Sequence, residues 1–119
     1  MPTQVPGEPY QRISVDEASK MYDSSDTVFI DVRREDEYNN GHIKDALLIP
    51  VDDILSRIGE LPEDKKLIFI CAAGVRSGLA CEMSAAMGIN SSLLYSITEG
   101  TDTWIETVSY THLTLPTKA

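Results

Sequence analysis

Short apolar runs alternate along the chain with segments whose apolar positions repeat at helical spacing. The runs at residues 27–32, 46–49, 67–71 and 92–97 predict buried strands. Residues 10–13 predict an additional edge strand. Short strands that alternate with helices predict an α/β fold, with a mostly parallel sheet covered by helices on both faces.

Five helices are expected between and after these strands. Ser14 and Glu17 have capping-box spacing and begin the first helix. The second is a short polar helix over residues 34–39. The third is expected from Val51 to Gly59 on the spacing of its apolar residues, and the fifth over residues 101–106. The fourth ends at Gly88, and its apolar positions are Leu79, Met83, Ala86 and Met87.

The chain divides into three parts. Residues 1–9 contain three prolines and predict a flexible or extended leader. Residues 10–107 form the expected domain. Residues 108–119 carry none of the 19 acidic residues, and their sequence is similar to the translation of a sequencing adapter, so we expect a non-native tail. The alternative is an edge strand.

Composition and charge exclude several classes of function. The 119 residues carry a formal net charge of −9, which disfavours direct binding to nucleic acid. No apolar run reaches the length of a membrane helix, and the first residues do not resemble a signal peptide. We therefore expect a cytoplasmic protein that contacts no membrane. Its two cysteines, Cys71 and Cys81, predict neither a disulfide framework nor a metal site.

The segment from Cys71 to Ser77 is the strongest candidate for chemistry. Cys71 ends a predicted strand, Arg76 and Ser77 begin a predicted helix, and small residues lie between them. Such a loop can point successive amide N–H groups at the sulfur, near the positive end of the helix dipole. Both effects favour the thiolate, which is the nucleophile. We expect Cys71 and Arg76 to act in catalysis, with Arg76 binding an anion. The loop residues expected to contact substrate are Ala72, Ala73, Gly74, Val75 and Ser77.

Three segments together resemble the rhodanese-like domain family. Residues 31–38 (DVRREDEY), 41–50 (GHIKDALLIP) and 71–77 (CAAGVRS) match family motifs in the family's order, and residues 99–104 (EGTDTW) match more weakly. The resemblance implies a rhodanese fold of about five strands and a sulfurtransferase similar to thiosulfate sulfurtransferases. Cys71 would take sulfane sulfur from thiosulfate, a persulfide or a polysulfide and hold it as a persulfide. It would then pass this sulfur to cyanide or a thiol. The resemblance implies no cofactor, and we also expect a protein partner in a sulfur relay.

Several residues near this loop are expected to act as scaffold. Asp31 and Arg33 lie on one side of a strand end and can hold the loop or each other. Glu37 is expected to pair with a cation or cap a turn, and His42 and Trp104 to be structural. Cys81 is expected to be half-buried, and its position inside the helix places it too far from Cys71 for a disulfide.

Two departures from the family leave alternatives open. Ala72 and Ala73 stand where many thiosulfate-active members carry a cation, and Asp45 replaces a glycine, which predicts an altered turn. A non-catalytic module that binds a partner or senses persulfide is therefore the alternative to an enzyme. A phosphatase or arsenate reductase is disfavoured, because four residues rather than five separate Cys71 from Arg76.

Overall fold

A central six-stranded sheet organises the protein in a computed structural model that describes residues 2–107 and 113–114. The strands follow the order β1-β2-β7-β6-β3-β5, and β4 pairs separately with β8. Their bounds are Thr3–Gln4 (β1), Gln11–Ile13 (β2), Thr27–Asp31 (β3), His42–Ile43 (β4), Leu47–Leu48 (β5), Lys66–Ile70 (β6), Leu94–Ile97 (β7) and Leu113–Thr114 (β8).

Five of the six strands are parallel, as expected. The neighbours β2, β7, β6, β3 and β5 all run in the same direction, whereas β1 pairs antiparallel with β2 at the edge. Part of the expected leader is therefore a strand, and β2 is not the edge. Because the strands are parallel, their carboxyl ends meet on one side of the sheet, where ligands bind in open α/β folds.

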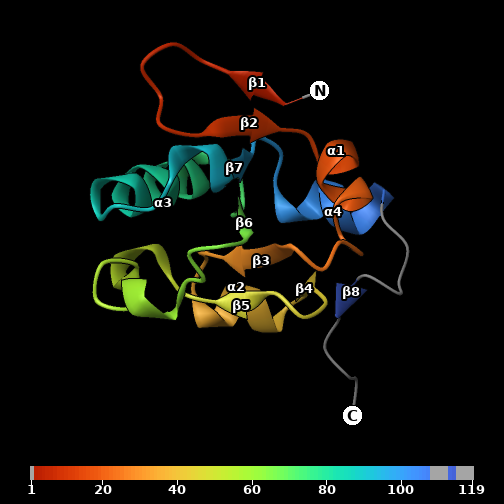
Figure 1. The fold of residues 1–119 in the computed structure, drawn as a ribbon. Coiled ribbons are helices and arrows are strands. Elements are labelled where there is room, and N and C mark those ends of the chain that lie inside the picture. Colours follow the sequence, from red (N-terminus) through yellow and green to blue (C-terminus); the bar gives the residue numbers. More distant parts are fainter. Residues whose placement is uncertain (1, 108–112, 115–119) are drawn as a thin grey trace.

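Helices cover both faces of the sheet (Figure 1). Helix α3 and the turns after β5 lie on one face, and α1 and α4 lie on the other. The helix bounds are Val15–Lys20 (α1), Glu35–Asn39 (α2), Val75–Ala86 (α3) and Thr101–Thr107 (α4), and the 3₁₀ turns are Val51–Asp53 (η1), Ile58–Glu60 (η2) and Ser91–Leu93 (η3).

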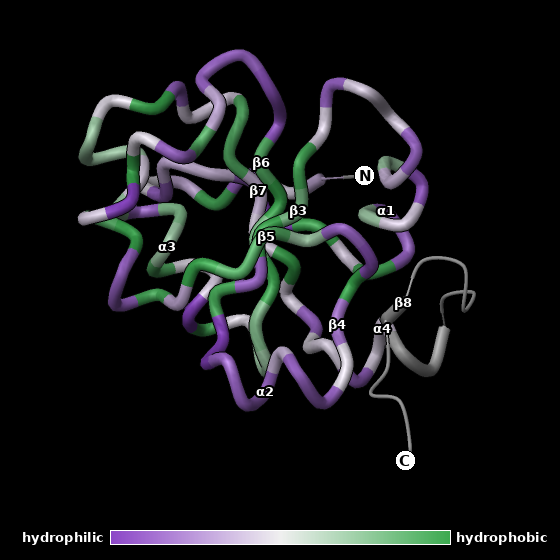
Figure 2. Tube along the Cα trace, turned by 90° about the horizontal axis from the view of Figure 1, so that it is seen from below, coloured by the Kyte–Doolittle hydropathy of each residue, from purple (hydrophilic) through white to green (hydrophobic). Residues whose placement is uncertain are grey.

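Two hydrophobic clusters form the core, one on each face of the sheet. On β6, Leu67 and Phe69 belong to the cluster beneath α3, whereas Ile68 and Ile70 belong to the cluster beneath α1 and α4. This alternation is the side-chain period of a strand that is buried on both faces. Hydrophobic residues accordingly concentrate along the strands at the centre of the molecule (Figure 2).

The helix expected from Val51 to Gly59 is wrong. The chain forms η1 and η2 instead, separated by turns. Of the predicted apolar face, Ile54 is fully buried, but Leu55 is 49% exposed. Because so short a segment recovers little of the cost of helix nucleation, its packing around Ile54 decides the local structure.

Helix α3 forms where expected, but most of the predicted apolar face is wrong. Met83 packs against the core, whereas Leu79, Ala86 and Met87 are exposed and small residues face the core instead. A helix that packs closely on a sheet can bury small side chains at the contact, where longer ones would not fit. The buried residues are Ser77, Gly78, Ala80, Cys81 and Ser84.

Two further expectations concern a turn and the tail. Asp45 adopts a φ of 66°, the left-handed conformation that glycine favours, and the expected alteration of the turn stays a prediction. In the tail, β8 pairs antiparallel with β4, as the edge-strand alternative predicts. Residues 108–112 and 115–119 lie outside the described residues, and a non-native origin of the tail stays a prediction.

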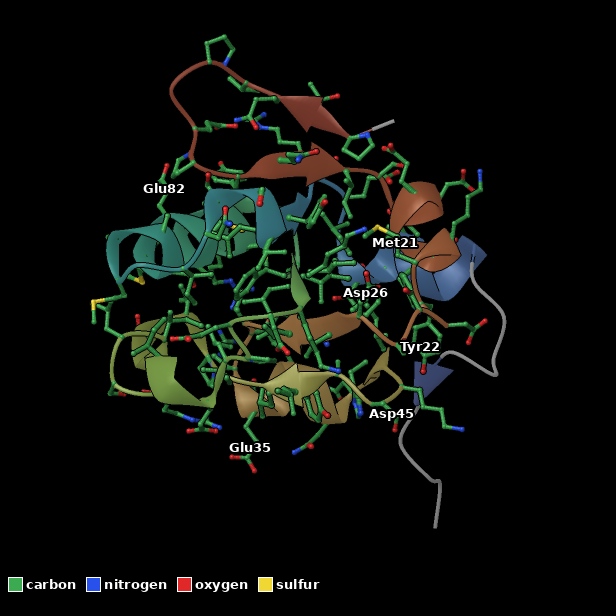
Figure 3. The ribbon with its side chains drawn as sticks, in the orientation of Figure 1. Met21, Tyr22, Asp26, Glu35, Asp45 and Glu82 are labelled. Atoms are coloured by element: carbon green, nitrogen blue, oxygen red, sulfur yellow. The ribbon has the colours of Figure 1, made fainter. Side chains whose placement is uncertain are left out.

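The surface carries many carboxylates. Glu35, Asp45 and Glu82 project from different elements (Figure 3), and all three are exposed. Within the residues that the structure describes, no helix is long and apolar enough to cross a membrane.

Candidate active site

Cys71 follows β6 directly and begins a tight loop that leads into α3. Gly74 reverses the chain with a φ of 88° and is the N-cap residue of α3. A Cβ atom on Gly74 would lie 2.6 Å from the carbonyl oxygen of Thr98, so only glycine satisfies both the backbone angle and the space. The loop is therefore shaped by glycine and by the chain that follows β7.

Backbone amides of this loop point at the cysteine sulfur, as expected. The amide nitrogens of Gly74 and Ser77 lie 3.0 Å and 3.3 Å from Sγ of Cys71, and both donate to it. Hydrogen bonds to sulfur at a helix N-terminus favour the thiolate, whereas burial opposes it. Cys71 has only 1% of its surface exposed. A reacting sulfur atom must therefore displace part of the loop to reach Sγ.

The hydroxyl of Ser77 adds a third contact to the sulfur. Its Oγ lies 3.6 Å from Sγ of Cys71 and 2.8 Å from Oγ of Ser96 on β7. Both serines are buried. Ser77 was expected to contact substrate, but the structure places its side chain inside, where it links the sulfur to β7. Ser96 was not predicted from the sequence, where the one sign of its role is that it is a polar residue inside an apolar strand.

The start of α4 holds the other side of the loop. The amide of Thr101 donates to the carbonyl oxygen of Cys71 over 3.2 Å. A side chain on Gly100 would collide with the carbonyl group of Ala72, so this glycine permits a close backbone approach. Gly100 and Thr101 come from the weakest of the family-like segments, and they position the cysteine backbone.

Arg76 does not present a free charge to the loop. Its guanidinium forms two hydrogen bonds with the carboxylate of Glu37 on α2, at 2.8 Å and 3.0 Å. Hydrogen bonding to Arg76 lowers the pKa of Glu37 to about 2. Glu37 also accepts from the amide of Arg34 and so caps α2. Both roles expected of Glu37 are confirmed, and the cation expected to bind an anion already has an anionic partner.

Asp31 and Arg33 hold each other, one of the two expected arrangements. Their side chains form a buried ion pair at 2.7 Å, and the guanidinium of Arg33 also donates to the carbonyl oxygen of Gly41. A buried charge requires such a paired environment. The pair therefore ties the end of β3 to the turn before β4.

The remaining candidates are structural. Nδ1 of His42 lies 2.8 Å from the carbonyl oxygen of Tyr38, and the two rings stack. Trp104 is fully buried and packs edge-on against Phe29, as expected for a packing residue. Cys81 is fully buried rather than half-buried, and this burial raises the pKa of its thiol well above its usual range.

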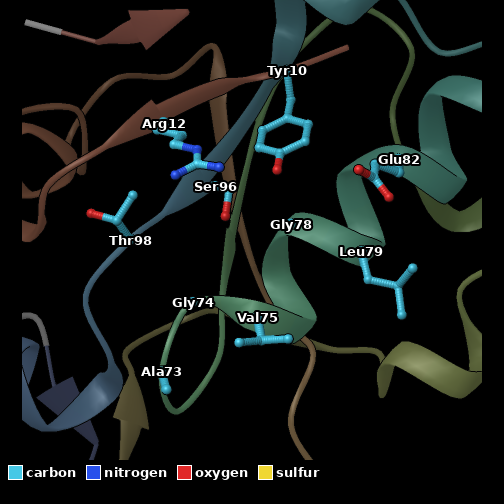
Figure 4. A pocket seen from close by; sticks show the side chains of 10 residues that line it. All are labelled: Tyr10, Arg12, Ala73, Gly74, Val75, Gly78, Leu79, Glu82, Ser96 and Thr98. Carbon is cyan, nitrogen blue, oxygen red and sulfur yellow. The ribbon is translucent and has the colours of Figure 1, made fainter. Parts of the chain in front are cut away.

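A groove borders the outer side of the loop (Figure 4). It has a volume of about 530 Å³ and lies between the start of α3 and strands β2 and β7. Ala73, Gly74 and Val75 form its loop side, and Ser96 reaches it from β7, but Cys71 is not among its lining residues. Ala72, Ala73 and Val75 are exposed, so a molecule that approaches the loop meets small or apolar side chains.

Metal ligation is not supported by the side chains in view. Among residues 2–107 and 113–114, no group of three or more His, Cys, Asp or Glu side chains is placed to hold a metal ion.

Curated relatives include proteins of two different names. The chain is 33% identical over 91 residues to the tRNA uridine(34) hydroxylase of Pectobacterium carotovorum, a match of 71% of this chain but 24% of that protein. It is 34% identical over 64 residues to a sulfurtransferase of Allochromatium vinosum, which is 54% of this chain and 60% of that protein. The chain thus spans about a quarter of the hydroxylase it matches.

Solved structures agree with the fold over most of the chain. A rhodanese-related protein from Thermoplasma volcanium superimposes with a TM-score of 0.75 at 27% identity, covering 89% of this chain and 99% of that one. The human single-domain sulfurtransferase superimposes with a TM-score of 0.71 at 26% identity, covering 87% and 100%. Residues 14–107 match the Rhodanese-like domain family. The chain therefore belongs to the rhodanese-like domain family, and its relatives include sulfurtransferases.

Proposed function

We propose that this domain is a sulfurtransferase that carries sulfane sulfur on Cys71. The observation that carries the proposal is the pair of amides, from Gly74 and Ser77, that donate to Sγ of Cys71. Donors aimed at the sulfur anion stabilise the thiolate that begins and ends each transfer. The sulfurtransferases among its relatives support the same chemistry.

The transfer takes place in two displacements. The thiolate of Cys71 attacks the outer sulfur of the donor, a new S–S bond forms, and the donor's own S–S bond breaks. The leaving group takes the electron pair and departs as sulfite from thiosulfate, or as a thiolate from a persulfide. A thiolate or cyanide then attacks the terminal sulfur, and Cys71 leaves as the thiolate that began the cycle. Neither displacement needs an external oxidant or reductant.

The burial of Cys71 limits how a donor reaches it. Because 1% of the residue is exposed, the outer sulfur enters only when part of the loop moves aside. Exposed Ala72 and Ala73 offer little steric resistance to such an approach. A small donor, or the tip of a flexible one such as a cysteine persulfide on another protein, fits this access.

Two cysteine variants test the proposal. With thiosulfate or a persulfide as donor and cyanide as acceptor, we expect Cys71→Ser to abolish formation of thiocyanate above the uncatalysed rate. Cys81→Ser is the matched control, because Cys81 is buried in α3 and takes no part in the transfer. Retained turnover in Cys71→Ser would refute the proposal. No turnover of the unaltered protein with any donor would favour a non-catalytic, partner-binding module.

A further inference from the structure

The charge around the cysteine loop is balanced before any substrate arrives. Arg76 is the one cation of the segment from Cys71 to Ser77. Glu37 engages it through both carboxylate oxygens, and the two side chains are 20% and 29% exposed, for Glu37 and Arg76 respectively. This partial burial shields the pair from water and strengthens it relative to an ion pair on the open surface.

The neighbouring charges on α2 do not change this balance. Arg34 lies 3.7 Å from Glu37 and 3.1 Å from Asp36, and both Arg34 and Asp36 are largely exposed. The four side chains comprise two cations and two anions. When Cys71 is a thiolate, these four side chains and the sulfur together carry one net negative charge.

These observations distinguish between classes of sulfur donor. Thiosulfate brings two negative charges to a site whose cation is already paired, and it must approach a thiolate. A protonated persulfide, R–S–SH, brings none at its reacting end. From this charge balance we propose that Glu37 is a specificity-determining residue, which directs the site toward persulfide donors and away from thiosulfate. This inference rests on the proposed sulfur transfer through Cys71.

The favoured step is balanced without a further reactant. Sγ of Cys71 forms a bond to the outer sulfur of R–S–SH, and the S–S bond of the donor breaks. The electron pair leaves on RS⁻, and the proton stays on the sulfur that Cys71 has gained. Glu37 does not touch the reacting atoms in this step; it acts by holding the charge of Arg76.

The test compares kcat/KM for thiosulfate with that for cysteine persulfide, using cyanide as acceptor and subtracting the uncatalysed rate. The unaltered protein should prefer the persulfide. Glu37→Gln removes one negative charge beside Arg76 and should raise kcat/KM for thiosulfate by about tenfold, as expected for a dianion near a partly shielded charge. The value for cysteine persulfide should change by less than about twofold, because the form that is attacked at its outer sulfur is R–S–SH, which is uncharged at that end.

Two further variants make the result specific. Glu35→Gln removes the same charge from an exposed position of the same helix and should leave both donors unchanged. Ala72→Lys places an unpaired cation on an exposed position beside Cys71 and should raise thiosulfate use without altering Glu37. It therefore tests the proposal even if Glu37→Gln disturbs the fold.

Each outcome supports or overturns the inference. It is overturned if the unaltered protein uses thiosulfate as efficiently as cysteine persulfide, or if a folded Glu37→Gln variant leaves the ratio of the two kcat/KM values unchanged. Where Glu37→Gln does not fold, an unchanged ratio in Ala72→Lys overturns it. Those results would leave sulfur transfer through Cys71 intact. Failure of both donors to yield thiocyanate with the unaltered protein would overturn the proposed function and the inference together.

Discussion

The hydroxyl oxygens of Ser77 and Ser96 lie 2.8 Å apart in the core, and Ser77 also contacts the sulfur of Cys71. Ser77 has one hydroxyl proton and several acceptors around it. In the thiol form, Sγ of Cys71 donates to Oγ of Ser77, and the Ser77 hydroxyl donates to the carbonyl oxygen of Gly74 over 3.1 Å. A thiolate can only accept, so a hydrogen bond to it requires Ser77 to turn its proton from Gly74 to the sulfur, while Oγ of Ser77 accepts from Ser96. A residue on β7 thus orients the hydroxyl that meets the sulfur.

This arrangement predicts an order of effects on the reactivity of Cys71. Alkylation of the Cys71 peptide at neutral pH should slow about fivefold in Ser77→Ala, which removes a hydrogen bond to the thiolate. It should slow about twofold in Ser96→Ala, which removes only the support of that bond. Peptide mass spectrometry over a time course measures both rates.

Ser84→Ala is the control for these serine variants. Ser84 is buried in the same helix, and its hydroxyl donates to the carbonyl oxygen of Ala80, away from the sulfur. We expect this variant to change the free energy of unfolding without changing alkylation of Cys71. Equal alkylation rates in all three variants would show that the serine pair does not act on the sulfur.

The ion pair between Glu37 and Arg76 predicts how stability depends on pH. Hydrogen bonding to Arg76 lowers the pKa of Glu37 from 4.5 to about 2 in the folded protein. Because the folded value is the lower one, the pair stabilises the fold above about pH 4.5, and this contribution disappears as the pH falls through about 2. The unfolding free energy of the unaltered protein should therefore exceed that of Glu37→Gln by about 1–3 kcal/mol near pH 6.

Urea unfolding of both proteins between pH 6 and acid pH measures this difference. It should shrink steadily on the acid side, whereas Glu35→Gln should differ little from the unaltered protein throughout. A difference that stays constant with pH would contradict the assignment of the ion pair as the cause.

Two glycines with similar backbone angles predict different costs. Gly74 and Gly88 have φ values of 88° and 98°. An added Cβ meets the carbonyl of Thr98 at Gly74 but nothing within 4 Å at Gly88. We expect Gly88→Ala to cost about 1–2 kcal/mol of stability for the backbone angle alone. Gly74→Ala should cost at least about 2 kcal/mol more, because backbone must move.

Denaturant unfolding and alkylation of Cys71 separate the two glycine variants. Gly74→Ala should also alter the alkylation rate, because it displaces an amide that donates to the sulfur. Gly88→Ala should leave that rate unchanged. Comparable stability losses in the two variants would mean that the loop yields easily at Gly74.

The strands and the cysteine loop were predictable because their signals are local. Runs such as residues 67–71 are apolar at every position, and such a continuous run is typical of a strand in a sheet that is buried on both faces. The loop combines a strand end, small residues and a helix start within seven positions. Its amide geometry follows from that local order.

The buried face of α3 and the partners of Arg76 and Ser77 were not predicted, because they depend on contacts between residues that are distant in sequence. Helix α3 buries small residues, so the search for large apolar positions selected exposed Leu79 and Met87. The partner of Arg76 lies 39 positions away, and Ser96 reaches Ser77 only through the packing of α3 on β7. Such pairings are set by tertiary structure, which a single sequence encodes only weakly.

The mass of the Cys71 peptide after incubation with cysteine persulfide tests the central claim most directly. Transfer through this residue predicts that the peptide gains the mass of one sulfur atom, that the gain is lost on addition of cyanide, and that the Cys81 peptide keeps its mass. A Cys71 peptide of unchanged mass, under conditions in which the protein still releases thiocyanate, would contradict the account.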